Sequence, residues 1–113
     1  MHHSTLDLEP GFAPVLSLRG VQVAQMTLAP GEHTGGPANR HAGADQWLYV
    51  VAGAGRAIVD GNEQALRPGS LLVIERGEAH EIRCSGEAPL RTLSVYSPPA
   101  YDAQGDRLPA GKG

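Results

Sequence analysis

The chain has 113 residues and is most simply one domain with a single hydrophobic core. Apolar residues make up 41% and charged residues 19%, which is too apolar a composition for a disordered chain. The formal net charge is −3 and the nine Lys and Arg residues form no run, which argues against nucleic acid and anionic membranes as partners. No apolar stretch approaches the roughly 18 residues that a membrane-spanning helix needs.

The N-terminus lacks a cationic segment followed by an apolar one, so we expect no signal peptide. The single cysteine, Cys84, cannot form an intrachain disulfide, which suits a reducing compartment. We therefore expect the protein in the cytoplasm, with Cys84 as a small buried apolar residue rather than a nucleophile.

The 15 glycines and 9 prolines stand between short apolar runs, a pattern typical of an all-β sandwich or barrel. Residues 1–12 show little periodicity and are expected to lie over the surface. The pattern predicts strands, in chain order, over residues 15–18, 21–28, 46–52, 56–59, 63–66, 71–74, 80–84 and 90–96. Asp60-Gly61-Asn62 is a strong hairpin signal, and residues 29–40, with three glycines and two prolines, are expected to form a loop.

The domain is expected to span residues 1–113, with a barrel core at about 13–97 and an extended C-terminal tail over 98–113. No segment has the periodicity of a helix. Residues 46–52 are apolar on both faces, so this strand is expected to be central and covered on both sides. Trp47 and Tyr49 are expected to pack between sheets or subunits rather than against a ligand.

Two histidines stand out against this β pattern. His41 lies just ahead of the 46–52 strand, and His80 lies 39 residues later, on the same face of its strand as Ile82 and Cys84. His80 is therefore predicted to point inward. A jelly roll or small barrel explains this, whereas an immunoglobulin-like sandwich fits the number of strands equally well but leaves the inward histidine unexplained.

A divalent transition metal prefers imidazole nitrogens and oxygen donors that converge from rigid strands. The candidate ligands of these types are His41, His80, Gln46 or Asp45, Asn39 and His33. The alternative is a buried polar cluster in which His41, His80, Gln46 and a trapped water satisfy one another. We find no Ser-His-Asp arrangement, phosphate-binding loop or CxxC pair that indicates another chemistry.

The order of these elements over about residues 21–96 resembles the cupin superfamily, whose members are small double-stranded β-helix (jelly-roll) barrels. The family's first motif contains His-x-His, then Glu, then Gly; anchored on Gly53, it places its Glu at Gln46 and its histidines at Asn39 and His41. The second motif, anchored on Gly69, places its Gly at Gly77, its His at His80, its Pro at Glu75 and its Asn at Cys84.

The resemblance implies a metal site at four positions, of which two are histidines (His41, His80) and two are amides (Asn39, Gln46). An amide oxygen is neutral and donates more weakly than an imidazole or a carboxylate. Asp45 restores a carboxylate only if the backbone turns it inward, and His33 replaces the missing histidine only if its loop folds back over the barrel.

We therefore expect a small cupin that holds Fe, Mn, Ni or Zn and binds or acts on a small, anionic, oxygen-bearing molecule, with oxygenase, isomerase or lyase chemistry. The alternative is a non-catalytic cupin that binds a small molecule or is structural and has lost the full metal site. Under either reading we expect a homodimer, in which the N-terminal strand or the Pro-rich tail packs across the two-fold axis.

Overall fold

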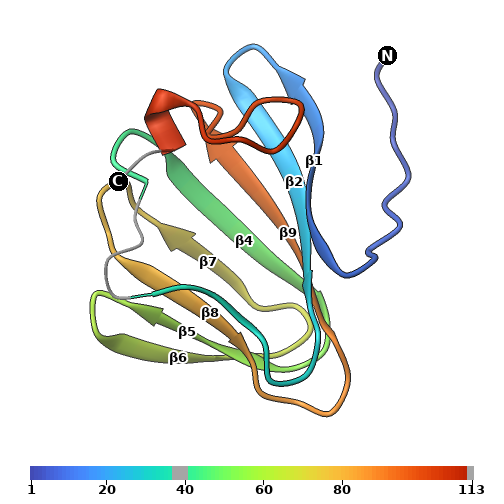
Figure 1. Ribbon diagram of the computed structural model, residues 1–113, viewed down its shortest axis with the longest axis vertical. Coiled ribbons are helices and arrows are strands. Elements are labelled where there is room, and N and C mark those ends of the chain that lie inside the picture. The colour runs from blue at the N-terminus through green and yellow to red at the C-terminus, as the bar shows by residue number, and fades with distance from the viewer. Residues whose placement is uncertain (37–40, 112–113) are drawn as a thin grey trace.

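The computed structural model describes residues 1–36 and 41–111, and these form two antiparallel β-sheets that face each other (Figure 1). The five-stranded sheet has the order β1-β2-β9-β4-β7 and the four-stranded sheet the order β3-β8-β5-β6. The strands are β1 (Gly11–Leu18), β2 (Val21–Leu28), β3 (His33–Gly35), β4 (Asp45–Ala52), β5 (Gly55–Val59), β6 (Asn62–Leu66), β7 (Leu71–Ile74), β8 (His80–Cys84) and β9 (Leu90–Ser97). The all-β prediction is confirmed.

The tight turn between β5 and β6 shows how glycine sets a strand boundary. Val59 pairs with Asn62, which leaves Asp60 and Gly61 as a two-residue loop with φ of 46° and 82°. Positive φ at both central residues is the geometry that matches the twist of a hairpin, and Asp-Gly is a preferred pair for it. The predicted hairpin is therefore confirmed.

The hydrophobic core lies between the sheets. Its members come from both layers, because alternate residues of each strand face the opposite sheet. They are Leu28, Leu48, Val50, Ala57, Leu66, Ile74, Ile82, Cys84 and Leu90. Cys84 is 4% exposed and its thiol donates to the Ala88 carbonyl at 3.4 Å, as expected for a small buried residue.

The prediction that β4 is covered on both faces is wrong for its outer face. Gln46, Leu48 and Val50 are buried, but Trp47 is 48% and Tyr49 43% exposed. The strand register extends this exposed face across the whole sheet, in a row that consists of Leu16, Val23, Val95, Trp47 and Val73. We call this surface the outer apolar face. The chain thus carries a second apolar layer that its own four-stranded sheet does not cover.

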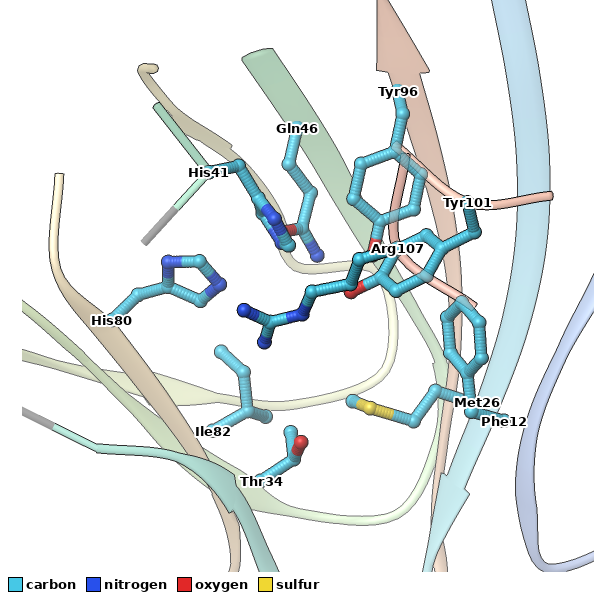
Figure 2. Close-up of a pocket in the computed structure, with 10 residues that line it drawn as sticks. All are labelled: Phe12, Met26, Thr34, His41, Gln46, His80, Ile82, Tyr96, Tyr101 and Arg107. Atoms are coloured by element: carbon cyan, nitrogen blue, oxygen red, sulfur yellow. The ribbon is translucent and has the colours of Figure 1, made fainter. Parts of the chain in front are cut away.

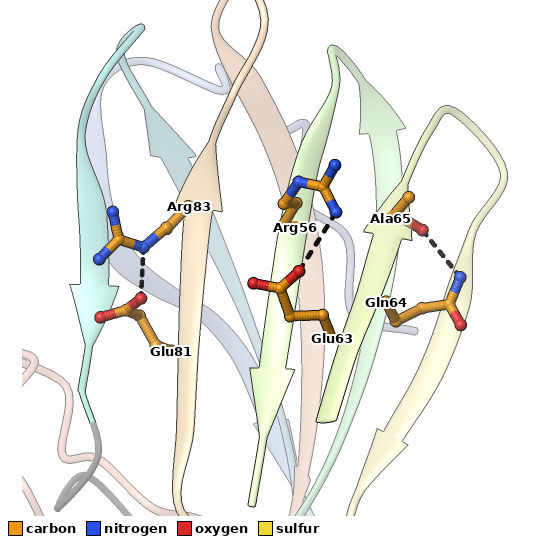
Figure 3. A network of polar contacts seen from close by, with 6 residues as sticks. All are labelled: Arg56, Glu63, Gln64, Ala65, Glu81 and Arg83. Carbon is orange, nitrogen blue, oxygen red and sulfur yellow. Dashed lines mark hydrogen bonds and ion pairs between the residues drawn. The ribbon is translucent and has the colours of Figure 1, made fainter. Parts of the chain in front are cut away.

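The outer surface of the four-stranded sheet is polar instead. Arg83 pairs with Glu81 along β8, and Arg56 on β5 pairs with Glu63 on β6 at 3.4 Å (Figure 3). Such exposed ion pairs add little stability, but they keep this surface hydrated. The two outer surfaces therefore differ in character.

Three segments differ from the sequence expectations. β1 begins at Gly11, earlier than predicted, and β3 forms inside the expected 29–40 loop. The tail is not extended: after Ser97 it crosses the end of the barrel, pairs Tyr101 with Arg107 and ends in a 3-10 helix, η1 (Pro109–Gly111). Figure 1 shows it arching over the ends of β4 and β9. Among residues 1–36 and 41–111, no helix is long and apolar enough to cross a membrane.

Candidate functional site

A cavity of about 100 Å³ lies between the two sheets, close to the start of β4 and of β8. It is lined by Phe12, Met26, Thr34, His41, Gln46, His80, Ile82, Tyr96, Tyr101 and Arg107 (Figure 2). This volume is small beside the roughly 300–1,000 Å³ of sites for drug-sized ligands. Phe12 and Arg107 are exposed, so the cavity communicates with solvent. It has room for a metal ion and a small acid rather than for a large substrate.

The two histidines meet in this cavity as predicted. His41 is 4% and His80 5% exposed, and their ring centroids are 5.1 Å apart. The carbonyl of His41 accepts a hydrogen bond from the Gly77 N–H at 2.8 Å, which ties the segment before β4 to the turn before β8. Gly77 has a φ of 85°, a left-handed conformation that favours glycine. The family-like glycine therefore helps to bring the imidazoles together.

Each imidazole is oriented by a backbone carbonyl. Nδ1 of His41 is 2.9 Å from the Gly111 carbonyl oxygen, and Nδ1 of His80 is 3.2 Å from the Glu78 carbonyl oxygen. A carbonyl only accepts, so Nδ1 carries the hydrogen in both rings and Nε2 carries the lone pair. Histidine ligands of metals commonly show this arrangement.

The cavity favours the neutral form of both rings. Burial lowers the pKa of His41 and of His80 from the ordinary value, and the positive charge of Arg107 lowers it further in each case. Neutral imidazole is the form that donates a lone pair to a metal.

These shifts predict an acid-sensitive fold. The unfolded histidines have a pKa near 6.5 and the folded ones a lower value, so below about pH 6.5 the unfolded chain binds more protons. The stability present above that pH should be lost as the pH falls, by at most about 1.4 kcal/mol per pH unit for each histidine. Urea unfolding of metal-free protein between pH 7 and 5 measures this. A His41→Gln/His80→Gln variant should flatten the profile; equal slopes in both proteins would contradict the prediction.

Gln46 brings an oxygen to the same place. Its side chain is 4% exposed, and its Nε2 donates to the Ser94 hydroxyl at 3.0 Å. Within residues 1–36 and 41–111, its Oε1 has no hydrogen-bond donor although it is buried. A buried acceptor without a donor costs free energy, and a ligand that supplies a positive centre or a hydrogen removes this cost.

The C-terminal tail adds residues that the sequence did not predict. Tyr101 and Arg107 line the cavity, and Figure 2 shows the Arg107 guanidinium directed toward the two imidazoles. The Gln22 side chain holds the tail: its Oε1 accepts from the N–H groups of Ala100 and Tyr101 at 3.1 Å, and its Nε2 donates to the Tyr101 carbonyl at 2.7 Å. In the sequence, Gln22 is only a glutamine within a predicted strand, and nothing in the pattern indicates that it binds the tail.

Aromatic rings close one side of the cavity. Tyr96 and Tyr101 pack edge to face with centroids 5.3 Å apart, and each also packs edge to face on His41. Burial raises the pKa of both phenols, so they remain neutral hydrogen-bond donors near the imidazoles.

The remaining candidate ligands do not reach the cavity. Asp45 faces outward and binds Arg76, with its Oδ2 3.1 Å from the guanidinium. His33 lies on β3 with its side chain half exposed, 3.7 Å from Glu81. Neither one therefore replaces a family ligand here. Asn39 lies outside the described residues.

The donor set defines what kind of metal ion this site fits. Two neutral imidazoles and one amide oxygen match a divalent transition metal in type, and the buried Gln46 oxygen accepts no hydrogen bond among the described residues. In the described part of the chain, no group of three His, Cys, Asp or Glu side chains is placed to hold a metal. The ion would thus keep its full charge beside the Arg107 cation. The residues fit a weakly held ion that an anionic ligand stabilises.

Comparisons with known proteins agree with this architecture. The tetracenomycin polyketide synthase protein TcmJ of Streptomyces glaucescens is 32% identical over 76 residues, which cover 67% of this chain and 50% of that protein. The chain thus spans only about half the length of this curated relative.

Two solved structures are also similar. A predicted oxalate decarboxylase from Thermotoga maritima is 26% identical with a TM-score of 0.70, over 78% of this chain and 79% of that one. A protein from Klebsiella pneumoniae with a double-stranded beta-helix domain is 22% identical with a TM-score of 0.71, over 84% and 82% of the two chains. The family model described as a cupin domain matches residues 24–96. The chain therefore belongs to the cupin domain family, and its two sheets form the cupin double-stranded β-helix.

Proposed function

We propose that this cupin binds a divalent transition metal through His41, His80 and Gln46, and that it binds or acts on a small anionic, oxygen-bearing molecule at that metal. The observation that carries the proposal is the orientation of the donors. Each Nδ1 lies within hydrogen-bond distance of a backbone carbonyl oxygen, so Nε2 carries the lone pair in each neutral ring, and the Gln46 oxygen accepts no hydrogen bond among the described residues.

Two further findings support the anionic ligand. The metal donors are all neutral, so a bound ion would attract a negative ligand. One similar structure is named as a predicted oxalate decarboxylase, and oxalate is a small dicarboxylate. Cupins often bind metals, and the cavity of about 100 Å³ suits a molecule of this size.

In this proposal each residue has a separate task. The metal, when bound, polarises an oxygen of the ligand. His41 and His80 stay neutral because they are buried, and their backbone partners fix the ring planes. Tyr96 and Tyr101 exclude water from one side and keep their protons. Oxygenase, isomerase and lyase chemistry are all compatible with this arrangement, because the fold does not select among them.

Metal titration tests the proposal. The protein is stripped with a chelator and titrated with Zn²⁺, Ni²⁺, Mn²⁺ and Fe²⁺ in a calorimeter. Changes to outer-shell partners of metal ligands typically cost about 10–100-fold in metal affinity, so His41→Ala and His80→Ala should each cost at least about that much. His33→Ala is the matched control, since His33 lies outside the cavity and should keep the parent affinity.

Two results would overturn the metal site. One is a parent protein that takes up none of the four metals. The other is His41→Ala or His80→Ala binding metal as tightly as the parent. The pair would then be a buried polar cluster of the kind the sequence also allowed.

A non-catalytic cupin remains the second candidate. The observation that favours it is that the described residues lining the cavity include no carboxylate, because Asp45 is turned outward to Arg76. Metal-loaded protein that binds small carboxylates with no turnover, by NMR of the mixture over a day, would support this binding role. Turnover that His41→Ala abolishes would exclude it.

Homodimerisation stays a prediction. We propose the outer apolar face as its contact surface, because one row of apolar side chains runs across all five strands: Leu16, Val23, Val95, Trp47 and Val73. Within the single chain the tail folds over its own barrel, and packing of the N-terminal strand or the tail across a two-fold axis stays a prediction. Sedimentation at several protein concentrations tests for the dimer, and a monomer at every concentration would reject it.

A further inference from the structure

We propose that Arg107, delivered to the cavity by the C-terminal tail, is the residue that binds the carboxylate of a small organic acid. This rests on the proposed function in one respect, since it assigns the ligand class to the same cavity. It adds a binding residue that lies beyond the matched cupin region of residues 24–96.

The placement of Arg107 suggests this role. Its guanidinium lines the same small cavity as His41 and His80, and Figure 2 shows it directed into the space between them and Tyr101. A guanidinium presents parallel N–H donors that match the two oxygens of a carboxylate.

The formal charges of the side chains that line the cavity also favour an anionic ligand. The two imidazoles are buried and neutral, Gln46 is neutral, and both phenols keep their protons, so Arg107 is the formal charge among the side chains lining the cavity. Adding a divalent metal makes the cavity more positive. An anion that touches both the metal and Arg107 offsets both charges, whereas a neutral molecule of equal size offsets neither.

The tail is built to keep Arg107 in place. Gln22 binds its backbone through three hydrogen bonds at Ala100 and Tyr101. The Leu108 N–H donates to the Ala100 carbonyl at 2.8 Å, directly after Arg107. Arg107 is also an exposed residue, so it stands where an entering acid first meets the cavity. An arginine held by its backbone at an entrance can select ligands by charge.

The test compares pyruvate, oxalate and malonate with the neutral amide pyruvamide, by calorimetry on metal-loaded protein freed of excess metal. Because hydrogen bonds between ionised partners are the strong ones, Arg107→Gln should weaken binding of the acids roughly 10-fold or more. Binding of pyruvamide should change little. Arg107→Lys keeps the charge but loses the paired N–H donors. Its affinity for the acids should therefore lie between that of the parent and that of Arg107→Gln.

Two readouts separate binding from a structural effect. Arg67→Gln removes the same charge from an exposed turn between β6 and β7 and should leave acid affinity unchanged. Zn²⁺ affinity without acid should be equal to or tighter than that of the parent in Arg107→Gln, because a repelling cation is gone. A variant that was merely misfolded would lose Zn²⁺ as well.

A second variant tests the tail itself. A Cβ at Gly111 would lie 2.2 Å from the Ala100 carbonyl oxygen, so Gly111→Ala should displace the tail, together with the carbonyl that orients His41, without replacing a cavity side chain. Acid affinity should fall in this variant too. Gly36→Ala is the matched control, because a Cβ there meets nothing within 4 Å.

The outcomes distinguish this inference from the proposed function. Zn²⁺ binding with acid affinity that is unchanged in Arg107→Gln would overturn the inference and leave the metal site standing. No Zn²⁺ binding, but Arg107-dependent acid binding by the metal-free protein, would support the inference and reject the metal. A parent that binds none of the three acids would overturn the inference.

Discussion

Replacing Gly53 with alanine should destabilise the barrel by about 2–5 kcal/mol. Gly53 has a φ of 88°, and a Cβ there would lie 2.2 Å from the Pro89 carbonyl oxygen and 2.9 Å from the Leu90 Cα. Left-handed backbone costs a residue with a Cβ about 1–2 kcal/mol. Forcing atoms into packed structure costs about 1–3 kcal/mol more. Equilibrium urea unfolding measures the sum.

Gly61→Ala separates the two costs. Gly61 has nearly the same φ, 82°, but a Cβ there meets nothing within 4 Å. Only the backbone cost of about 1–2 kcal/mol should remain. Equal losses at the two sites would mean that β9 moves away from Gly53 at no cost, which would contradict the close contact at the end of β4.

Leu48→Ala should have an effect of similar size in the core. Leu48 is 0% exposed and belongs to the cluster between the sheets. Removing a buried leucine side chain costs about 2–5 kcal/mol, because transfer free energy is lost and a cavity remains. The same substitution at Leu71, which is 62% exposed on the outer apolar face, should change the free energy of unfolding by no more than about 0.5 kcal/mol in dilute monomeric protein. A small effect at Leu48 would show that the two sheets close around the gap.

The strands were largely predictable because each carries its own local signal. β2, β7 and β8 have the predicted bounds, since apolar alternation and flanking turn residues define them without reference to other strands. The inward direction of His80 followed from the same alternation. β3 was missed because three residues, His33 to Gly35, are too few to show a period and their pairing with β8 is a distant contact.

Two further features depended on contacts that a pattern does not encode. The apolar outer face of β4 looks the same in sequence whether a sheet, a partner or solvent lies against it. The path of the tail depends on Gln22, 79 residues before Tyr101, and nothing in the spacing of these residues links them. The candidate metal donors were therefore predictable from local motifs, whereas Arg107 was not.

The barrel and the C-terminal tail supply different parts of the candidate site. The cupin match ends at residue 96, and it contains both imidazoles, the Gln46 amide and most of the strands, though not β1. The cationic side chain and the carbonyl that orients His41 come after it, from Arg107 and Gly111. A chimera that keeps the strands and exchanges residues 98–111 would retain the imidazole pair but change the charge that a ligand meets. If Arg107 binds the ligand as we propose, ligand preference would follow the sequence of the tail while the barrel stayed the same.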